Sequence, residues 1–318
     1  MQRTRLGRTG LDVSVAGLGC GGKSRLGQSQ GMSREHSIGV VRAAIDAGVN
    51  FIDTAAAYGT EEIVGEAVKG RRDEVVISTK VMMTRSGKLS DADLVDGTEL
   101  TRRVEAGLAR LGMDYIDILH IHAVDAVSYP RCRDEFYPAL ERLREAGKIR
   151  FTGLTERFAF DTTHEMAEIA LSDGLFDVLM LGLNFVNQTA IHKILPATQE
   201  KGIGTLCMFA VRGPLARQET ARALVEKLIG TGEVDPASVD RDDPLGFLTA
   251  PGVASSLTEA AYRYCRHTPG IDVTMTGTGN VDHLLQNLAS INAGPLPGAV
   301  LDRLTAIFGK VTSESGEP

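Results

Sequence analysis

Four side chains that could together move a proton occur in the first 122 residues of the chain: Asp53, Tyr58, Lys80 and His122. A free phenol has a pKa of about 10 and is a poor acid at neutral pH, but a nearby ammonium favours the phenolate and lowers that pKa. A buried ammonium needs an anion of its own, and a neutral imidazole can orient the other reactant. The four groups are therefore typical of a general acid that is tuned towards neutral pH.

Each of these residues stands at or soon after the end of an apolar run that is typical of a buried strand. Asp53 follows the run 49–52, Tyr58 comes five residues later, and Lys80 and His122 end later runs. Active sites of parallel α/β proteins gather at the carboxyl ends of their strands. Taken singly, such a residue is equally well explained as a helix cap or a solvated side chain. The convergence of several successive units is what favours a proton-transfer site.

The rest of the chain alternates between strand-like and helix-like segments. Strands are expected at 13–19, 49–53, 74–81, 115–122, 149–155, 177–184, 204–211 and 271–276. Helices are expected after Ser33 and at 61–69, 97–111, 134–146, 162–172, 190–201, 257–267 and 281–291. Eight such units predict the α/β class and a (β/α)8 TIM barrel, with a doubly wound open sheet as the alternative.

We expect one barrel domain over 1–318, preceded by a β-hairpin at 2–14. The stretch 213–255 follows the seventh strand and is interrupted by Pro, Gly and Asp, so it is expected to be an extended loop that helps to cover the substrate. The polar residues 313–318 are expected to form a disordered tail.

Composition excludes several classes of partner. The chain has 318 residues, of which 43% are apolar and 24% charged, as in an ordinary globular protein. A net charge of -7 without any Lys/Arg-rich run argues against nucleic acid and anionic membranes as partners. No apolar run has the length of a membrane span, no signal peptide is recognisable, and the four cysteines are widely spaced. We therefore expect a cytoplasmic protein with reduced thiols that acts on a small molecule.

The pattern Asp53-(x4)-Tyr58, Lys80 after a β-rich strand and Asp114-Tyr115-Ile116-Asp117-(x4)-His122 resembles that of the aldo-keto reductases. The resemblance runs from the Leu6-Gly7 hairpin to the helix with His283-(x3)-Asn287. It implies a barrel that binds a nicotinamide nucleotide, NAD(H) or NADP(H), in an extended pose and exchanges a hydride with a carbonyl or alcohol. It also implies that Tyr58 is the proton donor, that Lys80 and Asp53 tune it, and that His122 orients the carbonyl. No metal ion is part of this expectation.

The coenzyme is expected to lie along the strand ends on one side of the barrel. The residues expected to contact it are Gly21, Thr155, Glu156, Asn184, Arg212, Gly277, Thr278, Gly279, Asn280, His283 and Asn287. The segment 276–280 ends the last strand and opens a helix, so its backbone N–H groups can bind an anion. Arg212 could bracket the pyrophosphate or be a surface arginine. Asn287 resembles the asparagine that contacts adenine in the family.

The sequence departs from the family pattern around the nicotinamide carboxamide. Thr155-Glu156 stands where Ser-Asn is frequent, Met180 where a Gln is usual, and Leu183 where a Tyr often stacks on the ring. Glu156 could instead accept a hydrogen bond from the amide. Ala123 replaces a frequent Trp and leaves the substrate wall more open.

Other interpretations stay open. The run 17–22 satisfies GxGxxG, but no helix follows it directly, so a Rossmann fingerprint is disfavoured, and its glycines are expected to clear space near the substrate or nicotinamide. A barrel aldolase with Lys80 as Schiff-base nucleophile, or a redox-silent binding protein, would fit the same scaffold. In the family that the sequence resembles, NADPH-preferring members usually carry Lys or Arg around the last strand and the start of the next helix, but none occurs between Gly277 and Asn287. NAD(H) is therefore expected to serve at least as well as NADP(H), although Thr278, Asn280 and the helix N-terminus could still bind a 2′-phosphate that Asp282 would repel. The pattern sets no oligomeric state.

Overall fold

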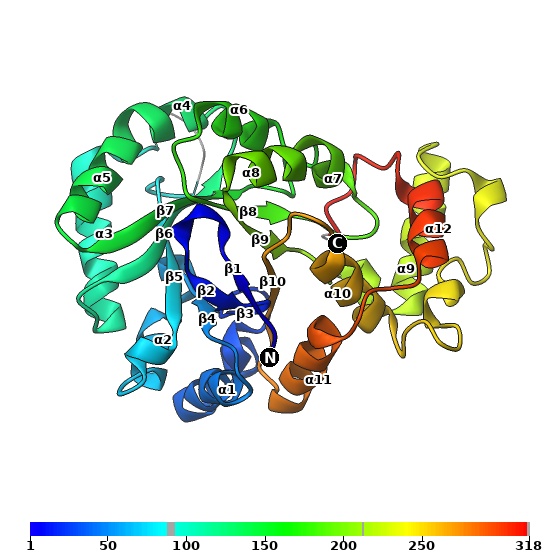
Figure 1. Cartoon of the computed structure of the whole chain (residues 1–318), viewed down its shortest axis with the longest axis horizontal. Coiled ribbons are helices and arrows are strands. Elements are labelled where there is room, and N and C mark those ends of the chain that lie inside the picture. Colours follow the sequence, from blue (N-terminus) through cyan, green and yellow to red (C-terminus); the bar gives the residue numbers. More distant parts are fainter. Residues whose placement is uncertain (88–92, 212, 317–318) are drawn as a thin grey trace.

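Eight parallel strands close into a barrel in the computed structural model, which describes residues 1–87, 93–211 and 213–316 (Figure 1). The barrel strands are β3 (Ala16–Gly19), β4 (Phe51–Asp53), β5 (Val76–Met82), β6 (Ile116–Val124), β7 (Ile149–Glu156), β8 (Val178–Gly182), β9 (Gly204–Met208) and β10 (Val273–Thr276). They pair in chain order from β3 to β9, and β10 closes the ring between β9 and β3. The expected (β/α)8 barrel is confirmed, and the open sheet is excluded.

Helices cover the outside of the barrel (Figure 1). They are α1 (Arg34–Asp46), α2 (Glu61–Ala67), α3 (Gly97–Leu111), α4 (Tyr129–Arg131), α5 (Tyr137–Glu145), α6 (Glu165–Asp173), α7 (Thr189–Lys193), α8 (Leu195–Lys201), α9 (Gln218–Gly230), α10 (Leu257–His267), α11 (Val281–Asn292) and α12 (Gly298–Phe308). The helix α3 has the bounds expected from sequence, because Asp96 caps it by accepting from Glu99 N and Gly112 ends it at φ 63°. Within the described part of the chain, no helix is long and apolar enough to cross a membrane.

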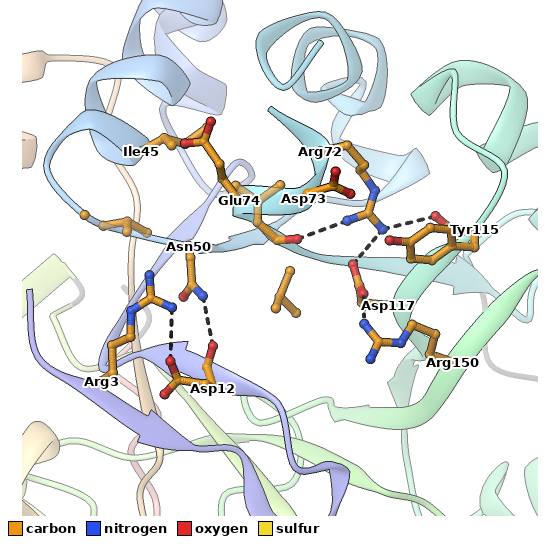
Figure 2. Close-up of a pocket in the computed structure, with 14 residues that line it drawn as sticks. Arg3, Asp12, Ile45, Asn50, Arg72, Asp73, Glu74, Tyr115, Asp117 and Arg150 are labelled. Atoms are coloured by element: carbon orange, nitrogen blue, oxygen red, sulfur yellow. Dashed lines mark hydrogen bonds and ion pairs between the residues drawn. The ribbon is translucent and has the colours of Figure 1, made fainter. Parts of the chain in front are cut away.

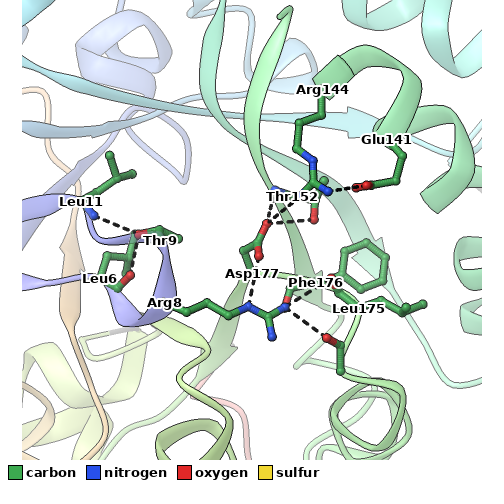
Figure 3. A network of polar contacts seen from close by, with 11 residues as sticks. Leu6, Arg8, Thr9, Leu11, Glu141, Arg144, Thr152, Leu175, Phe176 and Asp177 are labelled. Carbon is green, nitrogen blue, oxygen red and sulfur yellow. Dashed lines mark hydrogen bonds and ion pairs between the residues drawn. The ribbon is translucent and has the colours of Figure 1, made fainter. Parts of the chain in front are cut away.

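The expected hairpin, β1 (Arg3–Arg5) with β2 (Asp12–Ser14), closes the N-terminal end of the barrel. Leu6, Leu11 and Val13 pack with side chains of the barrel interior in one buried cluster. Arg8 fastens the hairpin turn to the segment before β8, because its Nε lies 3.1 Å from an Asp177 oxygen (Figure 3). With this end closed, the carboxyl ends of the strands are left to form a site.

The segment after β9 differs from the expected loop, because it contains a regular helix. Residues Gln218–Gly230 form α9, with Ala221, Leu224, Val225 and Leu228 buried on one face. Arg303 of α12 stacks on the Phe247 ring of the same segment, 4.2 Å from the ring centroid. The spacing of these apolar residues was present in the sequence, but the flanking Pro and Gly residues concealed it.

The C-terminal tail also differs from expectation over its described residues. Glu314 and Ser315 are 5% and 7% exposed, so they are held against the protein and not frayed. The Glu314 carbonyl accepts a hydrogen bond from Asn187, the Ser315 carbonyl accepts one from Asn184, and the Glu314 carboxylate pairs with Lys227. These hydrogen bonds and this ion pair hold the tail in place, although its low hydrophobicity alone predicts disorder. Residues 317 and 318, which belong to the same expectation, lie outside the described residues.

Candidate active site

A buried ion pair lies at the carboxyl ends of β4 and β5. Lys80 Nζ is 2.5 Å from an Asp53 carboxylate oxygen, and the two side chains are 1% and 6% exposed. The other Asp53 oxygen accepts from the Ser78 hydroxyl at 2.9 Å, and Lys80 also donates to the Thr54 carbonyl. Burial by itself lowers the pKa of Lys80, but the Asp53 carboxylate and the Tyr58 hydroxyl outweigh it, so the pKa is raised and the ammonium persists.

Tyr58 is held beside this pair by a short turn that ends in Gly59. The turn Ala56–Tyr58 is a single 3-10 turn, and Gly59 leaves it at φ 70°, a conformation that glycine adopts without strain. Lys80 Nζ lies 4.8 Å from the centroid of the Tyr58 ring. A Cβ added to Gly21 would come within 2.5 Å of the same ring. Gly21 therefore gives the Tyr58 ring room to lie over the strand ends.

His122 completes the cluster from β6. Its ring stands edge-on to Tyr58, with the centroids 5.6 Å apart and the planes at 88°. Burial and then the charge of Lys80 lower the pKa of His122 to about 3, so its imidazole is neutral at physiological pH. The structure thus brings together all four residues that the sequence marked for proton transfer.

A second histidine, His120, lies at the register position of Lys80 on the neighbouring strand and is fully buried. Burial and Lys80 lower the pKa of His120 to about 3 as well. Its ring packs on β7 at Gly153, where a Cβ would come within 2.3 Å of His120 Nδ1. His120 is therefore a neutral imidazole beside the ion pair, and Gly153 makes room for it.

The pKa of His120 makes the stability of the protein depend on pH. The unfolded chain takes up a proton at about pH 6.5, whereas folded His120 does so only at about pH 3. Because of this residue alone, the free energy of unfolding should therefore be lowered by about 1.4 kcal/mol for each pH unit between pH 6.5 and about pH 3. Urea unfolding of His120→Leu at a series of pH values should give a shallower acid dependence by that amount. The exposed His192→Gln variant is the control, and parallel curves for wild type and His120→Leu would contradict the assignment.

Two adjoining cavities lie at this end of the barrel. One, of about 370 Å³, is lined by Asp53, Tyr58 and Gly21 and by residues that follow β3, β9 and β10. The other, of about 870 Å³, lies between α10 and α11. The residues that line both are Val211, Tyr262, Gly277 and Thr278. The two cavities therefore form one continuous groove that leads from Tyr58 to α11.

The coenzyme residues expected from the sequence divide into four groups, of which the last follows in the next paragraph. Those that line the groove are Gly21, Gly277, Thr278, His283 and Asn287. Two others shape the turn before α11: Asn280 caps the helix by accepting from His283 N, and Gly279 approaches Gly27 so closely that a Cβ would come within 2.3 Å of the backbone. Arg212 lies outside the described residues.

Three residues expected to contact the coenzyme at the ends of β7 and β8 are not among those that line the groove, and their polar atoms have protein partners. The Glu156 carboxylate accepts from His164 Nδ1 and from Gly182 N, and its side chain is 0% exposed. Asn184 is fully buried, accepts from Val186 N and Asn187 N, and donates to the Ser315 carbonyl. The Thr155 hydroxyl accepts from Ala123 N at 2.8 Å. These three residues therefore build the wall behind the groove and do not face into it.

The groove also contains residues that the sequence analysis missed. Phe209 lines it, whereas Leu183, which stands where the family often has a stacking Tyr, is fully buried. The seventh strand was expected to run to residue 211, but β9 ends at Met208 and Phe209 turns off at φ 68°. Had the strand been predicted to end at Met208, Phe209 would have been a candidate groove residue. Further residues of this kind are Lys23, Ser24, Gln30, Met208 and Met275, and Met180, which stands where the family usually has a Gln, lines the groove as well.

A cavity of about 490 Å³ at the opposite end of the barrel is a poor alternative site (Figure 2). One of its carboxylates, Asp117, is 1% exposed and is already paired with Arg72 at 2.7 Å and Arg150 at 2.6 Å. Asp117 also accepts from Ile77 N, which joins β5 to β6. Charges that satisfy one another at the amino ends of the strands stabilise the barrel and offer no reactive group.

The chain is similar to known proteins over nearly its whole length. The chain is 28% identical to L-galactose dehydrogenase of Arabidopsis thaliana over 293 residues, which cover 90% of this chain and 86% of that protein. It is 27% identical to versiconal hemiacetal acetate reductase of Aspergillus parasiticus, over 93% of this chain and 94% of that one. The holo form of aldo-keto reductase AKR11C1 from Bacillus halodurans shares the fold, with a TM-score of 0.71 and 22% identity over 99% of this chain and all of that one.

One protein-family model matches nearly the whole chain. Its model, Aldo/keto reductase family, matches residues 17–308, from the first barrel strand to the last helix. The two relatives described above are a dehydrogenase and a reductase by name. The chain is therefore an oxidoreductase, and it belongs to the aldo/keto reductase family.

Proposed function

We propose that this enzyme uses NAD(H) or NADP(H) to transfer a hydride between nicotinamide and the carbonyl or alcohol carbon of an aldehyde, ketone or sugar. The observation that carries the proposal is the cluster of Asp53, Tyr58, Lys80 and His122 at the end of a continuous groove. The coenzyme supplies or accepts the hydride when it is bound. The protein residues bind and orient the reactants and move the proton.

Proton transfer falls to Tyr58 in this proposal. In reduction, its hydroxyl donates a proton to the carbonyl oxygen, and in oxidation its phenolate accepts the proton of the alcohol. The Lys80 ammonium, fixed by Asp53 at 2.5 Å, stabilises the phenolate that remains. His122 is neutral, so it can donate one hydrogen bond to the same oxygen without competing as an acid.

The surroundings of Lys80 argue against the aldolase alternative. A Schiff-base lysine attacks as a neutral amine and needs a lowered pKa and access to the substrate. The Lys80 side chain is 1% exposed and bound to Asp53, and its pKa is raised. Failure of borohydride to trap a carbonyl substrate on the protein is the expected result.

The groove fits a dinucleotide in shape and in chemistry. The cavity at Tyr58 has an apolar wall of Met180, Met208, Phe209 and Met275, which suits the nicotinamide ring. The cavity at α11 contains His283 and Asn287, which suit the adenosine half. Between the two lie Gly277 and Thr278, next to the amino end of α11, where a phosphate is favoured. These residues would hold the coenzyme in an extended pose.

Coenzyme preference follows from the charges at the adenosine end. No Lys or Arg is among the described residues that line the cavity at α11, whereas Glu259 is. A hydrogen bond to a charged group contributes about 1.5–3 kcal/mol, which corresponds to about ten- to a hundredfold in affinity. We therefore expect NAD(H) to be used at least as well as NADP(H). The measurement is kcat/KM for both coenzymes with one substrate, and a preference for NADPH above about a hundredfold would contradict the expectation.

The likeness to L-galactose dehydrogenase makes sugars the first substrates to test. Lys23, Ser24 and Gln30 add polar groups to the lining of the Tyr58 cavity, as a polyhydroxylated substrate requires. The test is a panel of aldoses, simple aldehydes and ketones, assayed in both directions with each coenzyme. Turnover of any class supports the proposal, and the absence of coenzyme binding and of turnover throughout the panel would contradict it.

A further inference from the structure

A buried acid–histidine pair lies behind the groove, and the mechanism above does not use it. Glu156 ends β7 and His164 immediately precedes α6, and both side chains are 0% exposed. His164 Nδ1 lies 2.8 Å and 3.0 Å from the two carboxylate oxygens. One of these oxygens also accepts from Gly182 N at 3.1 Å, which ties the pair to the end of β8.

The backbone at His164 is strained, as at a position that its surroundings hold in place. Its φ is 64°, in the left-handed region that non-glycine residues seldom adopt. Such conformations persist only where neighbouring contacts enforce them, and they cluster at functional sites. The bond from His164 to Glu156 is one such contact.

A continuous series of ring contacts leads from this pair to the groove. The His164 ring stacks on Phe158, with centroids 5.2 Å apart and planes at 17°. Phe158 in turn meets Phe209 edge-on at 5.6 Å, and Phe209 lines the Tyr58 cavity. Gly182 makes room for this arrangement, because a Cβ there would lie 2.1 Å from the Phe158 ring. The position of the Phe209 ring thus depends on contacts that begin at Glu156.

We propose that Glu156 and His164 are positioning residues, which hold Phe158 and through it fix the Phe209 ring against the nicotinamide end of the coenzyme. The inference rests on the proposed coenzyme-dependent function. It explains why a carboxylate stands at residue 156: the carboxylate acts on the wall of the groove and not on the carboxamide. Because the pair contacts only the wall of the groove, its loss should weaken binding of the nicotinamide half of the coenzyme and leave binding of the adenosine half unchanged.

Two ligands separate these halves: NADH, and ADP-ribose, which lacks nicotinamide. Their affinities are measured by calorimetry on the full chain; if the wild type binds only NADPH, that coenzyme and 2′-phospho-ADP-ribose take their place. Glu156→Ala should raise the Kd of NADH by about three- to tenfold, the range expected for a misplaced aromatic contact. The Kd of ADP-ribose should stay within about twofold of wild type. Glu156→Gln keeps an acceptor for Gly182 N and His164, so it should restore part of the affinity for NADH.

Phe158→Leu tests the same series of contacts without opening the buried pair, so it replaces Glu156→Ala if that variant does not fold. It should also lower the affinity for NADH and leave the affinity for ADP-ribose unchanged. Asp177→Ala is the matched control, because it removes a mostly buried carboxylate at the opposite end of β8 (Figure 3) and should leave both ligands unchanged.

The outcomes are distinct. Selective weakening of NADH in Glu156→Ala or Phe158→Leu, with recovery in Glu156→Gln, supports the positioning role. Equal weakening of both ligands, or no change in either, overturns it while leaving the proposed function intact. A wild-type protein that binds neither NADH nor NADPH contradicts the proposed function itself, and the positioning role with it.

Discussion

Replacing Tyr58 by Phe should lower kcat by about 10²- to 10⁴-fold, the range that general acid–base catalysis contributes. The substitution keeps the ring that packs on Gly21 and stands edge-on to His122, and it removes only the hydroxyl. Coenzyme affinity should therefore be retained, so the loss should appear in kcat and not in the Kd of NADH. Steady-state kinetics together with calorimetric titration of the coenzyme make this measurement.

The matched control is Tyr137→Phe, which removes a hydroxyl from a ring that packs edge-on against Phe176, outside the proposed site. That variant should keep wild-type kcat. A Tyr58→Phe enzyme with kcat within about tenfold of wild type, below the usual range for a lost general acid, would exclude Tyr58 as the proton donor.

Replacing Asp53 by Asn should lower the free energy of unfolding by about 3–5 kcal/mol, because it leaves the Lys80 ammonium buried without an anion. The Lys80 side chain is 1% exposed, so water cannot replace the lost carboxylate. Activity should fall as well, since an unpaired ammonium shifts either its protonation or its position beside Tyr58. Urea unfolding gives the stability change.

Two further variants distinguish the effect of leaving a buried charge unpaired from the effect of losing any ion pair. The double variant Asp53→Asn/Lys80→Met removes both charges and should recover part of the lost stability. Asp12→Asn breaks the Arg3–Asp12 pair, whose side chains are 47% and 69% exposed, and should change the free energy of unfolding by less than about 1 kcal/mol. If Asp53→Asn changed the free energy of unfolding as little as Asp12→Asn does, the Asp53–Lys80 pair would not stabilise the site.

The barrel and the four clustered residues could be predicted from sequence because the relevant signals are local. Apolar runs fix where strands lie, and a polar residue at the end of such a run must emerge at the carboxyl end of a parallel barrel. Asp53 ends β4, and Lys80 and His122 lie near the carboxyl ends of their strands, so their convergence follows from the topology alone. The fold neighbour confirms the barrel, and the family match confirms the family.

The residues that form the wall behind the groove could not be predicted in this way, since their positions depend on partners distant in the chain. Asn184 binds the carbonyl of Ser315, 131 residues away, and this contact decides both that the tail is ordered and that Asn184 does not face the groove. Glu156 faces His164 because a strained turn places the imidazole beside it. Neither residue type nor spacing encodes such contacts. Phe209 was missed for a simpler reason, because the end of its strand was placed too late.

Transfer of deuterium from nicotinamide to product would show directly that this enzyme moves a hydride between its coenzyme and its substrate. The wild-type enzyme is supplied with NADH deuterated at the transferable position and with the best aldose or aldehyde of the panel, and the product is analysed by mass spectrometry. We expect the former carbonyl carbon to carry the deuterium, and we expect Tyr58→Phe to form this product about 10²- to 10⁴-fold more slowly. Product without deuterium, or equal rates for the two proteins, would contradict it.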